Sequence, residues 1–120
     1  KEMISGHKSP EINILINGLD TIRWNEIDKN KKIILYRVLQ ELFVNMKKHS
    51  EATLASISFN IKNKNLHVIY IDNGIGIKNN TLILKNGLQN VESRIKTING
   101  TINFGINTQK GFKISFTFPL

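Results

Sequence analysis

The sequence predicts a single α+β domain, a two-layer sandwich with helices on one face of a mixed or antiparallel sheet. The chain has 120 residues, 40% of them hydrophobic, which suits one domain with a packed core. Two stretches show the apolar spacing of helices, and five show the shorter patterns of strands. They follow one another as strand, helix, two strands, helix and two strands.

The first strand is predicted over residues 11–17, where isoleucines alternate with other side chains (Ile12, Ile14, Ile16). Residues 18–30 are mixed in character, with Trp24 and Ile27 as apolar anchors. The strongest helix pattern follows over residues 31–50. Its apolar residues recur at helical spacing and define one broad face: Ile34, Leu35, Val38, Leu39, Leu42, Phe43 and Met46.

Two strands are expected next, over residues 55–61 and 66–71, joined by a turn at residues 63–65. The first alternates apolar and polar side chains, as strands with one buried face do. The second is a more continuous apolar run, which predicts a more central strand. It ends at a cluster of turn-forming residues, 72–76.

A short loop over residues 78–85 leads to a second helix, predicted over residues 87–98 and ended by the Asn-Gly pair at 99–100. Residues 101–106 and 112–118 are expected to form a closing hairpin. No stretch of eighteen apolar residues occurs, so no membrane-spanning helix is expected within these 120 residues.

The composition argues against several classes of function. The sequence has no cysteine, which excludes disulfides and a cysteine nucleophile, and its three scattered histidines make a dedicated zinc site unexpected. The net charge of +8 allows an anionic partner, such as nucleic acid, a membrane surface or nucleotide phosphates. The lysines are spread along the chain without interleaved aromatic residues, so nucleic-acid binding is not expected.

Polar residues share one stripe of the first helix. Glu41, Asn45 and the neighbours Lys48 and His49 are spaced so that they follow one edge of the apolar face. There a carboxylate can act as a base, an amide oxygen suits Mg²⁺, and the cations can meet phosphate oxygens. Taken alone, this stripe is more typical of a solvated helix edge.

Two glycine-containing segments are the other candidates. Asp72 ends a buried strand and is placed to accept a hydrogen bond from an adenine amino group, while Gly74 and Gly76 let the backbone approach the base. The alternative is a turn cap, because Asn-Gly is common in hairpins. Gly87 begins the second helix and either presents backbone N–H groups to a phosphate or simply starts the helix.

Four segments occur in a characteristic order: ELFVNMKKHS, IDNGIGI, NGLQNVESRI with ING, and KGFKISFTFPL. This order resembles the nucleotide-binding catalytic domain of bacterial two-component sensor histidine kinases, in the ATPase superfamily that includes gyrase, the heat-shock chaperone ATPases and MutL. The resemblance extends from about residue 11 to residue 120. It implies the Bergerat ATP-binding fold, with ATP and Mg²⁺ bound between the helix layer and the sheet.

The resemblance also implies roles for individual residues. In the family's motifs, Glu41 occupies the position of the base, Asn45 that of the Mg²⁺ ligand and Asp72 that of the adenine-binding acid. The nucleotide-binding positions are Asn45, Lys48, His49, Asp72, Gly74, Gly76, Ile77, Gly87 and Leu88. Arg94 matches an arginine of the second helix.

Two positions depart from the family's pattern. Lys85 stands where the lid motif has its first glycine, and Phe112 follows Gly111 where a threonine is usual. The first change bears on the flexibility of the phosphate loop, and the second removes a hydroxyl from the site. Neither touches Asn45 or Asp72, so nucleotide binding is expected to survive.

The resemblance implies a function for the whole protein. The domain binds Mg-ATP and supplies the γ-phosphoryl to a histidine on a separate helical domain of the same sensor kinase. Residues 1–10 are then a lead-in from an absent upstream dimerisation and phosphoacceptor region, and residues 11–120 are the ATP-binding catalytic domain. His7 does not lie on a long amphipathic helix and is not expected to be the acceptor, so the fragment alone would not phosphorylate itself.

The same resemblance implies partners and a location. A response regulator acts downstream, and a dimer forms only through the upstream region. The domain is expected on the cytoplasmic side of the cell, and full-length members of the family often carry a membrane anchor.

Other functions fit parts of the sequence. An anti-sigma-type serine kinase or an ATPase switch would use the same fold, although the Lys-His-Ser ending at residues 48–50 is more typical of histidine kinases. A degenerate pseudokinase that holds its partner without turnover is left open by Lys85 and Phe112. A basic nucleic-acid-binding module is allowed by the charge alone.

Overall fold

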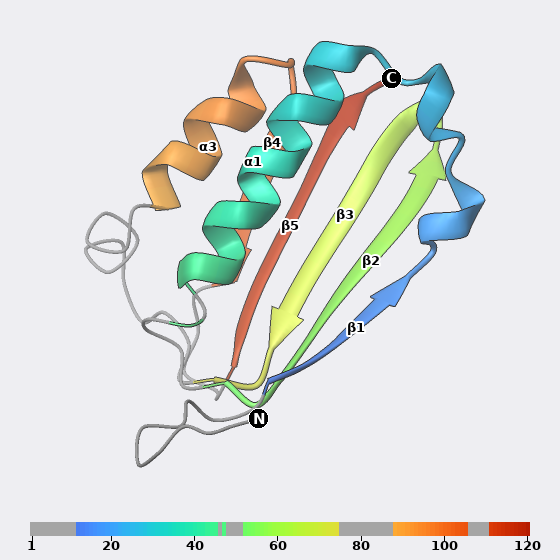
Figure 1. Ribbon diagram of the computed structural model, residues 1–120. Coiled ribbons are helices and arrows are strands. Elements are labelled where there is room, and N and C mark those ends of the chain that lie inside the picture. Colours follow the sequence, from blue (N-terminus) through green and yellow to red (C-terminus); the bar gives the residue numbers. More distant parts are fainter. Residues whose placement is uncertain (1–11, 46, 48–51, 75–87, 106–110) are drawn as a thin grey trace.

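Two α-helices lie side by side over one face of a five-stranded sheet (Figure 1). The computed structural model describes residues 12–45, 47, 52–74, 88–105 and 111–120. The helices are α1 (Lys29–Asn45) and α3 (Leu88–Lys96), and the strands are β1 (Asn13–Asn17), β2 (Leu54–Lys62), β3 (Asn65–Asp72), β4 (Thr101–Gly105) and β5 (Phe112–Pro119). This arrangement confirms the predicted fold class, an α+β two-layer sandwich with its helices on one face of a mixed sheet.

The strand order in the sheet is β1-β2-β3-β5-β4. Strand β1 runs parallel to β2, and the other neighbouring pairs are antiparallel. The parallel pair is joined through α1, as a parallel connection requires a crossover. Strand β3 lies at the centre of the sheet, as its continuous apolar run predicts.

Both predicted hairpins form. Asn63 and Lys64 connect β2 to β3, and both have positive φ angles of 53° and 63°. This is the geometry of a type I′ turn, whose twist matches that of the flanking strands. Strands β4 and β5 pair antiparallel as the closing hairpin.

Helix α1 begins two residues earlier than the sequence analysis predicts. Asp28 caps its first turn, where Oδ2 accepts a hydrogen bond of 3.3 Å from the backbone N–H of Lys31. The prediction overlooked this aspartate and placed the start at residue 31. The predicted extension beyond Asn45 falls on residues 46 and 48–51, which lie outside the described part of the chain.

The mixed segment before α1 contains two short 3₁₀ helices, η1 (Leu19–Thr21) and η2 (Trp24–Glu26). Trp24 anchors it, because its Nε1 donates a hydrogen bond of 3.0 Å to the carbonyl of Leu19 and its ring meets the ring of Phe59 edge-on at 5.5 Å. The anchoring role predicted for Trp24 is therefore confirmed.

Helix α3 ends at Lys96, two residues before the predicted end, and the Asn-Gly pair completes the turn that follows. Asn99 adopts a positive φ of 62°, and the N–H of Gly100 donates to the carbonyl of Ile95 at 3.0 Å. These features satisfy the last carbonyls of the helix and turn the chain toward β4.

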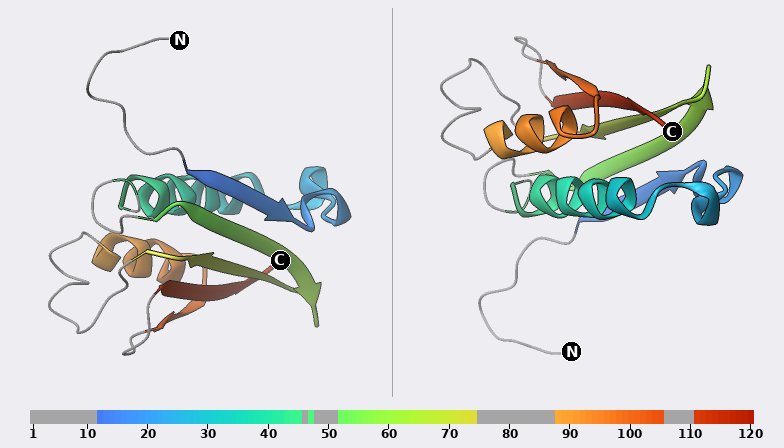
Figure 2. Two further views of the ribbon diagram at one scale, coloured as in Figure 1. Left: turned by 90° about the horizontal axis from the view of Figure 1, so that it is seen from below. Right: turned by 90° about the horizontal axis from the view of Figure 1, so that it is seen from above.

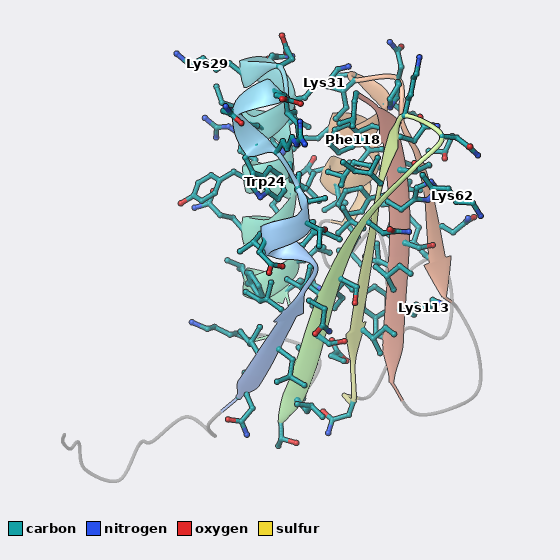
Figure 3. The ribbon with its side chains drawn as sticks, turned by 90° about the vertical axis from the view of Figure 1, so that its right-hand side faces the viewer. Trp24, Lys29, Lys31, Lys62, Lys113 and Phe118 are labelled. Atoms are coloured by element: carbon teal, nitrogen blue, oxygen red, sulfur yellow. The ribbon has the colours of Figure 1, made fainter. Side chains whose placement is uncertain are left out.

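The core lies between the helices and the sheet, where alternate residues of the three central strands are buried. Ile57, Tyr70 and Ile114 lie next to one another on this face. The other face is more polar, and Lys62 and Lys113 project from it (Figure 3). All five residues of the edge strand β1 are exposed.

The ends of two helices and two strands lie together at one end of the molecule. The C-terminal ends of α1 and β3 and the N-terminal ends of α3 and β5 lie there together (Figures 1 and 2). Of the polar residues singled out in the sequence, Glu41, Asn45 and Asp72 are described and lie near these ends. Of the helices in the described ranges, none is long and apolar enough to cross a membrane.

Candidate functional site

Asn45 is the last residue of α1 and points inward. It continues the helix's buried stripe, which contains Leu35, Val38 and Leu42. The residue is 9% exposed, and its Oδ1 atom is buried without a hydrogen-bond partner within the described residues. A buried amide oxygen in this state is costly, about 1–3 kcal/mol. A neutral, hard oxygen that lacks a donor is well suited to Mg²⁺, so this atom fits the cation that the sequence predicts.

Glu41 lies one turn earlier on α1 and is engaged by α3. The Nε atom of Arg94 donates a hydrogen bond of 2.7 Å to Glu41 Oε1, and both side chains are partly buried. The ion pair links the two helices next to Asn45. The sequence placed Glu41 and Arg94 in the site without foreseeing that they contact each other.

Asp72 ends β3 on the helix-covered face of the sheet. It is 3% exposed, and its carboxylate accepts two hydrogen bonds from the protein. The hydroxyl of Tyr70 donates to Oδ2 at 2.7 Å, and the backbone N–H of Gly74 donates to Oδ1 at 2.9 Å. A carboxylate has about four acceptor positions, so it keeps the capacity to accept from a ligand.

A backbone contact holds the chain after Asp72 against the start of β5. The N–H of Gly111 donates to the carbonyl of Gly74 at 2.7 Å. Gly111 has a φ of +104°, and a Cβ there would lie 2.9 Å from the carbonyl oxygen of Asp72. Only glycine combines this conformation with so close an approach.

Phe112 pairs with Asp72 across the β3–β5 ladder and is buried. Its ring contacts that of Tyr70, with centroids 6.1 Å apart and planes inclined by 60°. The residue that replaces the expected threonine therefore extends the apolar core up to the carboxylate. The hydroxyl beside Asp72 comes from Tyr70, two residues earlier on β3.

The pKa of Tyr70 lies well above its usual range. Burial of the phenol is the main cause, followed by its hydrogen bond to Asp72 and the negative charge of that carboxylate. Tyr70 therefore keeps its proton at neutral pH and acts as a donor.

Asn73 joins the end of β3 to the chain that enters β2. Its Oδ1 accepts hydrogen bonds from the N–H groups of Thr53 and Leu54 at 2.9 and 3.0 Å, and its Nδ2 donates to Thr53 Oγ1 at 3.0 Å. The site segment after Asp72 is thus tied to the strand next to it.

The sequence analysis missed Tyr70 and Asn73. Two-residue alternation places Tyr70 on the same face as Asp72, which is a signal that could have found it. Asn73 was considered only as part of a turn, and its partners at residues 53 and 54 carry no sequence signal of their own.

The remaining predicted residues divide into two groups. Leu88 is the first residue of α3 and is buried in the core. The others lie outside the described ranges: Lys48, His49, Gly76, Ile77 and Gly87, together with Lys85 and the predicted loop.

Comparison with known proteins identifies the family. Residues 30–120 match the model of the histidine kinase-, DNA gyrase B-, and HSP90-like ATPases. The chain is 32% identical to the sensor histidine kinase ComP of Bacillus subtilis (strain 168), over 78% of this chain and 13% of that protein. It is 30% identical to the sensor histidine kinase LiaS of the same organism, over 78% of this chain and 26% of that protein.

Solved structures show the same fold. The histidine kinase domain of the Erythrobacter litoralis EL346 blue-light activated kinase superposes with a TM-score of 0.75 at 15% identity, covering 91% of this chain and 55% of that one. Full-length ShkA in complex with AMPPNP gives a TM-score of 0.67 at 20% identity, covering 91% of this chain and 25% of that one. The chain spans about an eighth and a quarter of the two curated relatives described above. It belongs to the family of histidine kinase-, DNA gyrase B-, and HSP90-like ATPases, and it is homologous to sensor histidine kinases.

Proposed function

We propose that this chain binds Mg-ATP at the end of the molecule where α1, β3, α3 and β5 meet. Asp72 recognises the adenine amino group, and Asn45 is the protein's ligand to Mg²⁺. The phosphates extend toward the chain around Lys48, His49 and Gly87. The bound nucleotide supplies the γ-phosphoryl for a histidine on a separate helical domain of the same sensor kinase.

The observation that carries the proposal is the pair of buried polar side chains, Asp72 and Asn45, at one end of an otherwise apolar core. Asp72 keeps acceptor capacity after its two internal hydrogen bonds, and Asn45 Oδ1 has no partner among the described residues. Buried polar groups are normally satisfied, so the unpartnered Oδ1 atom of Asn45 points to a cation. The acceptor positions that remain on Asp72 suit a ligand that bears a donor.

The chain's own residues position the nucleotide and form no covalent bond to it. Phosphoryl transfer depends mainly on alignment and charge neutralisation. Bound Mg²⁺ would supply part of that neutralisation. Glu41 orients the incoming imidazole or accepts its proton, and it does so either through Oε2 or after the contact between Oε1 and Arg94 opens.

The partners belong to the parts of the kinase beyond this domain. The relatives named as sensor histidine kinases support an upstream dimerisation and phosphoacceptor region and a downstream response regulator. An ATPase switch or a pseudokinase that binds without turnover is the second candidate, and the ion pair on Glu41 favours it because the pair occupies the proposed base.

Two experiments test the proposal. Calorimetric titration of the 120-residue chain with Mg-ATP should show saturable binding, and absence of binding would contradict it. A phosphotransfer assay that offers either the helical phosphoacceptor domain or a serine-containing protein should label only the histidine. ATP binding without transfer to either protein would support the second candidate, whereas labelling of serine would support the anti-sigma-type serine kinase.

A further inference from the structure

Tyr70 is a buried side chain whose only polar group faces the candidate site. Its residue is fully buried, and its hydroxyl donates to Asp72 Oδ2 at 2.7 Å. The two residues are separated by one position of β3, so their side chains share the helix-covered face of the sheet. Asp72 Oδ1 is fixed separately by the N–H of Gly74.

We propose that Tyr70 is a positioning residue for purine recognition, fixing the Asp72 carboxylate so that its remaining acceptor positions face the exocyclic amino group of adenine. This inference rests on the proposed function. It assigns the selectivity for adenine to a pair of residues rather than to Asp72 alone.

Packing holds the phenol in place. The ring of Phe112 meets the ring of Tyr70 at 6.1 Å, and Tyr70 has no exposed surface through which it could turn away. Removing the hydroxyl would leave the ring in its packed position and would take one of the two internal donors from the carboxylate.

The polarity of the contact matters for the ligand. Since the raised pKa of Tyr70 keeps the phenol protonated, Oδ2 accepts a hydrogen bond from that side. The carboxylate's remaining positions are acceptors for a ligand. An amino group at the purine 6-position satisfies the carboxylate, whereas a ring with hydrogen at that position does not.

The test compares ATP with purine riboside triphosphate, which lacks the 6-amino group. The 120-residue chain is titrated with each nucleotide in the presence of Mg²⁺, unsubstituted and as Tyr70→Phe. Tyr36→Phe is the matched control, because Tyr36 lies exposed on α1 and its hydroxyl contacts only Gln40 among the described residues.

Tyr70→Phe is expected to weaken ATP binding roughly threefold to tenfold, which is the range that a typical hydrogen bond contributes. Its affinity for the analogue should change by less than about twofold, so the preference for ATP falls. Tyr36→Phe should leave the preference unchanged. Equal loss for both nucleotides in Tyr70→Phe would show a merely structural role and overturn the assignment.

A second measurement covers the case in which Tyr70→Phe does not fold. The chain has two tyrosines, so Tyr36→Phe leaves Tyr70 as the sole one. Labelled with 3-fluorotyrosine, this variant gives one ¹⁹F resonance, which ATP should shift more than the analogue does. Equal shifts would overturn the inference, and failure of the unsubstituted chain to bind ATP would overturn the proposed function and this assignment with it.

Discussion

Asn45 occupies a position on α1 where packing favours an apolar side chain. It follows Leu35, Val38 and Leu42 on the buried stripe, and its Oδ1 is unpartnered within the described residues. The fold therefore carries an energetic cost at this residue, which a metal ligand would explain.

Asn45→Leu should raise the stability of the ligand-free chain by about 1 kcal/mol, because it replaces an unsatisfied buried amide with an apolar side chain of similar size. The same change should abolish the Mg²⁺ dependence of ATP binding. Urea unfolding and calorimetry measure the two effects. Asn90→Leu, on the exposed side of α3, is the control and should give neither. A destabilised variant that keeps its Mg²⁺ dependence would place the ligand elsewhere.

Tyr70 makes the free energy of unfolding depend on pH in the alkaline range. In the unfolded chain its phenol loses its proton near pH 10, whereas in the folded chain the raised pKa keeps it protonated. The unfolded state then binds fewer protons, so stability falls as the pH rises above about 10, by up to about 1.4 kcal/mol per pH unit from this group.

Tyr70→Phe should remove this contribution, so its urea midpoint should decline less steeply between about pH 9 and about pH 11 than that of the unsubstituted chain. The control Tyr36→Phe retains Tyr70 and should decline as steeply as the parent. The same decline in all three chains would show that Tyr70 titrates normally in the folded protein.

At the scale of the elements, the β3–β5 junction positions Asp72. Gly111 allows the start of β5 to approach the backbone of Asp72, and its N–H holds Gly74 at 2.7 Å. Strain introduced at this junction would reach both Asp72 and Gly74.

Gly111→Ala should destabilise the fold by about 1–3 kcal/mol, because alanine disfavours the positive φ and its Cβ meets a carbonyl oxygen. The molecules that remain folded should also bind ATP more weakly. Gly18→Ala is the matched control, because Gly18 follows the C-terminal end of β1, has a positive φ, and a Cβ there would clash with the backbone of Phe59. It should destabilise without changing affinity. Wild-type affinity in folded Gly111→Ala would show that the junction does not position the site.

The α1–α3 contact is the second element-level feature. Arg94 and Glu41 are 36% and 27% exposed at their side chains, so solvent screens their attraction only in part. Their pairing links α1, one turn before Asn45, to the last turn of α3.

Glu41→Gln should cost about 0.5–1 kcal/mol of stability while retaining ATP binding. In a reconstituted full-length kinase it should slow phosphoryl transfer. Glu92→Gln, which breaks the more exposed pair with Lys96 on α3, should affect neither transfer nor binding and should cost about 0.3 kcal/mol or less. Unaltered transfer in Glu41→Gln would remove the base role from this residue.

Across the whole molecule, periodicity predicted the order of the elements and the central position of β3. Those features depend on apolar spacing, which local sequence contains. The ion pair between Glu41 and Arg94 depends on how two helices pack, and the contact from Tyr70 to Asp72 depends on side-chain geometry. Neither is encoded in spacing, so the sequence predicted Glu41 and Asp72 as candidate residues but not their partners.

The start of α1 was mispredicted although the sequence contains a local signal for it. Asp28 is a local capping signal that was present in the sequence and was outweighed by the apolar pattern beginning further on. The exposure of β1 required the three-dimensional structure, because alternation predicts a strand without saying whether it lies at an edge.

The measurement that tests the account most directly is the affinity of Asp72→Asn for Mg-ATP. An amide in place of the carboxylate presents a donor or a weaker acceptor to the adenine amino group, so binding should weaken about tenfold to a hundredfold. Asp20→Asn, at an exposed position of η1, is the matched control and should bind like the unsubstituted chain. Saturable binding by the parent, lost in Asp72→Asn alone, is the predicted result; equal affinity in all three chains would contradict the account.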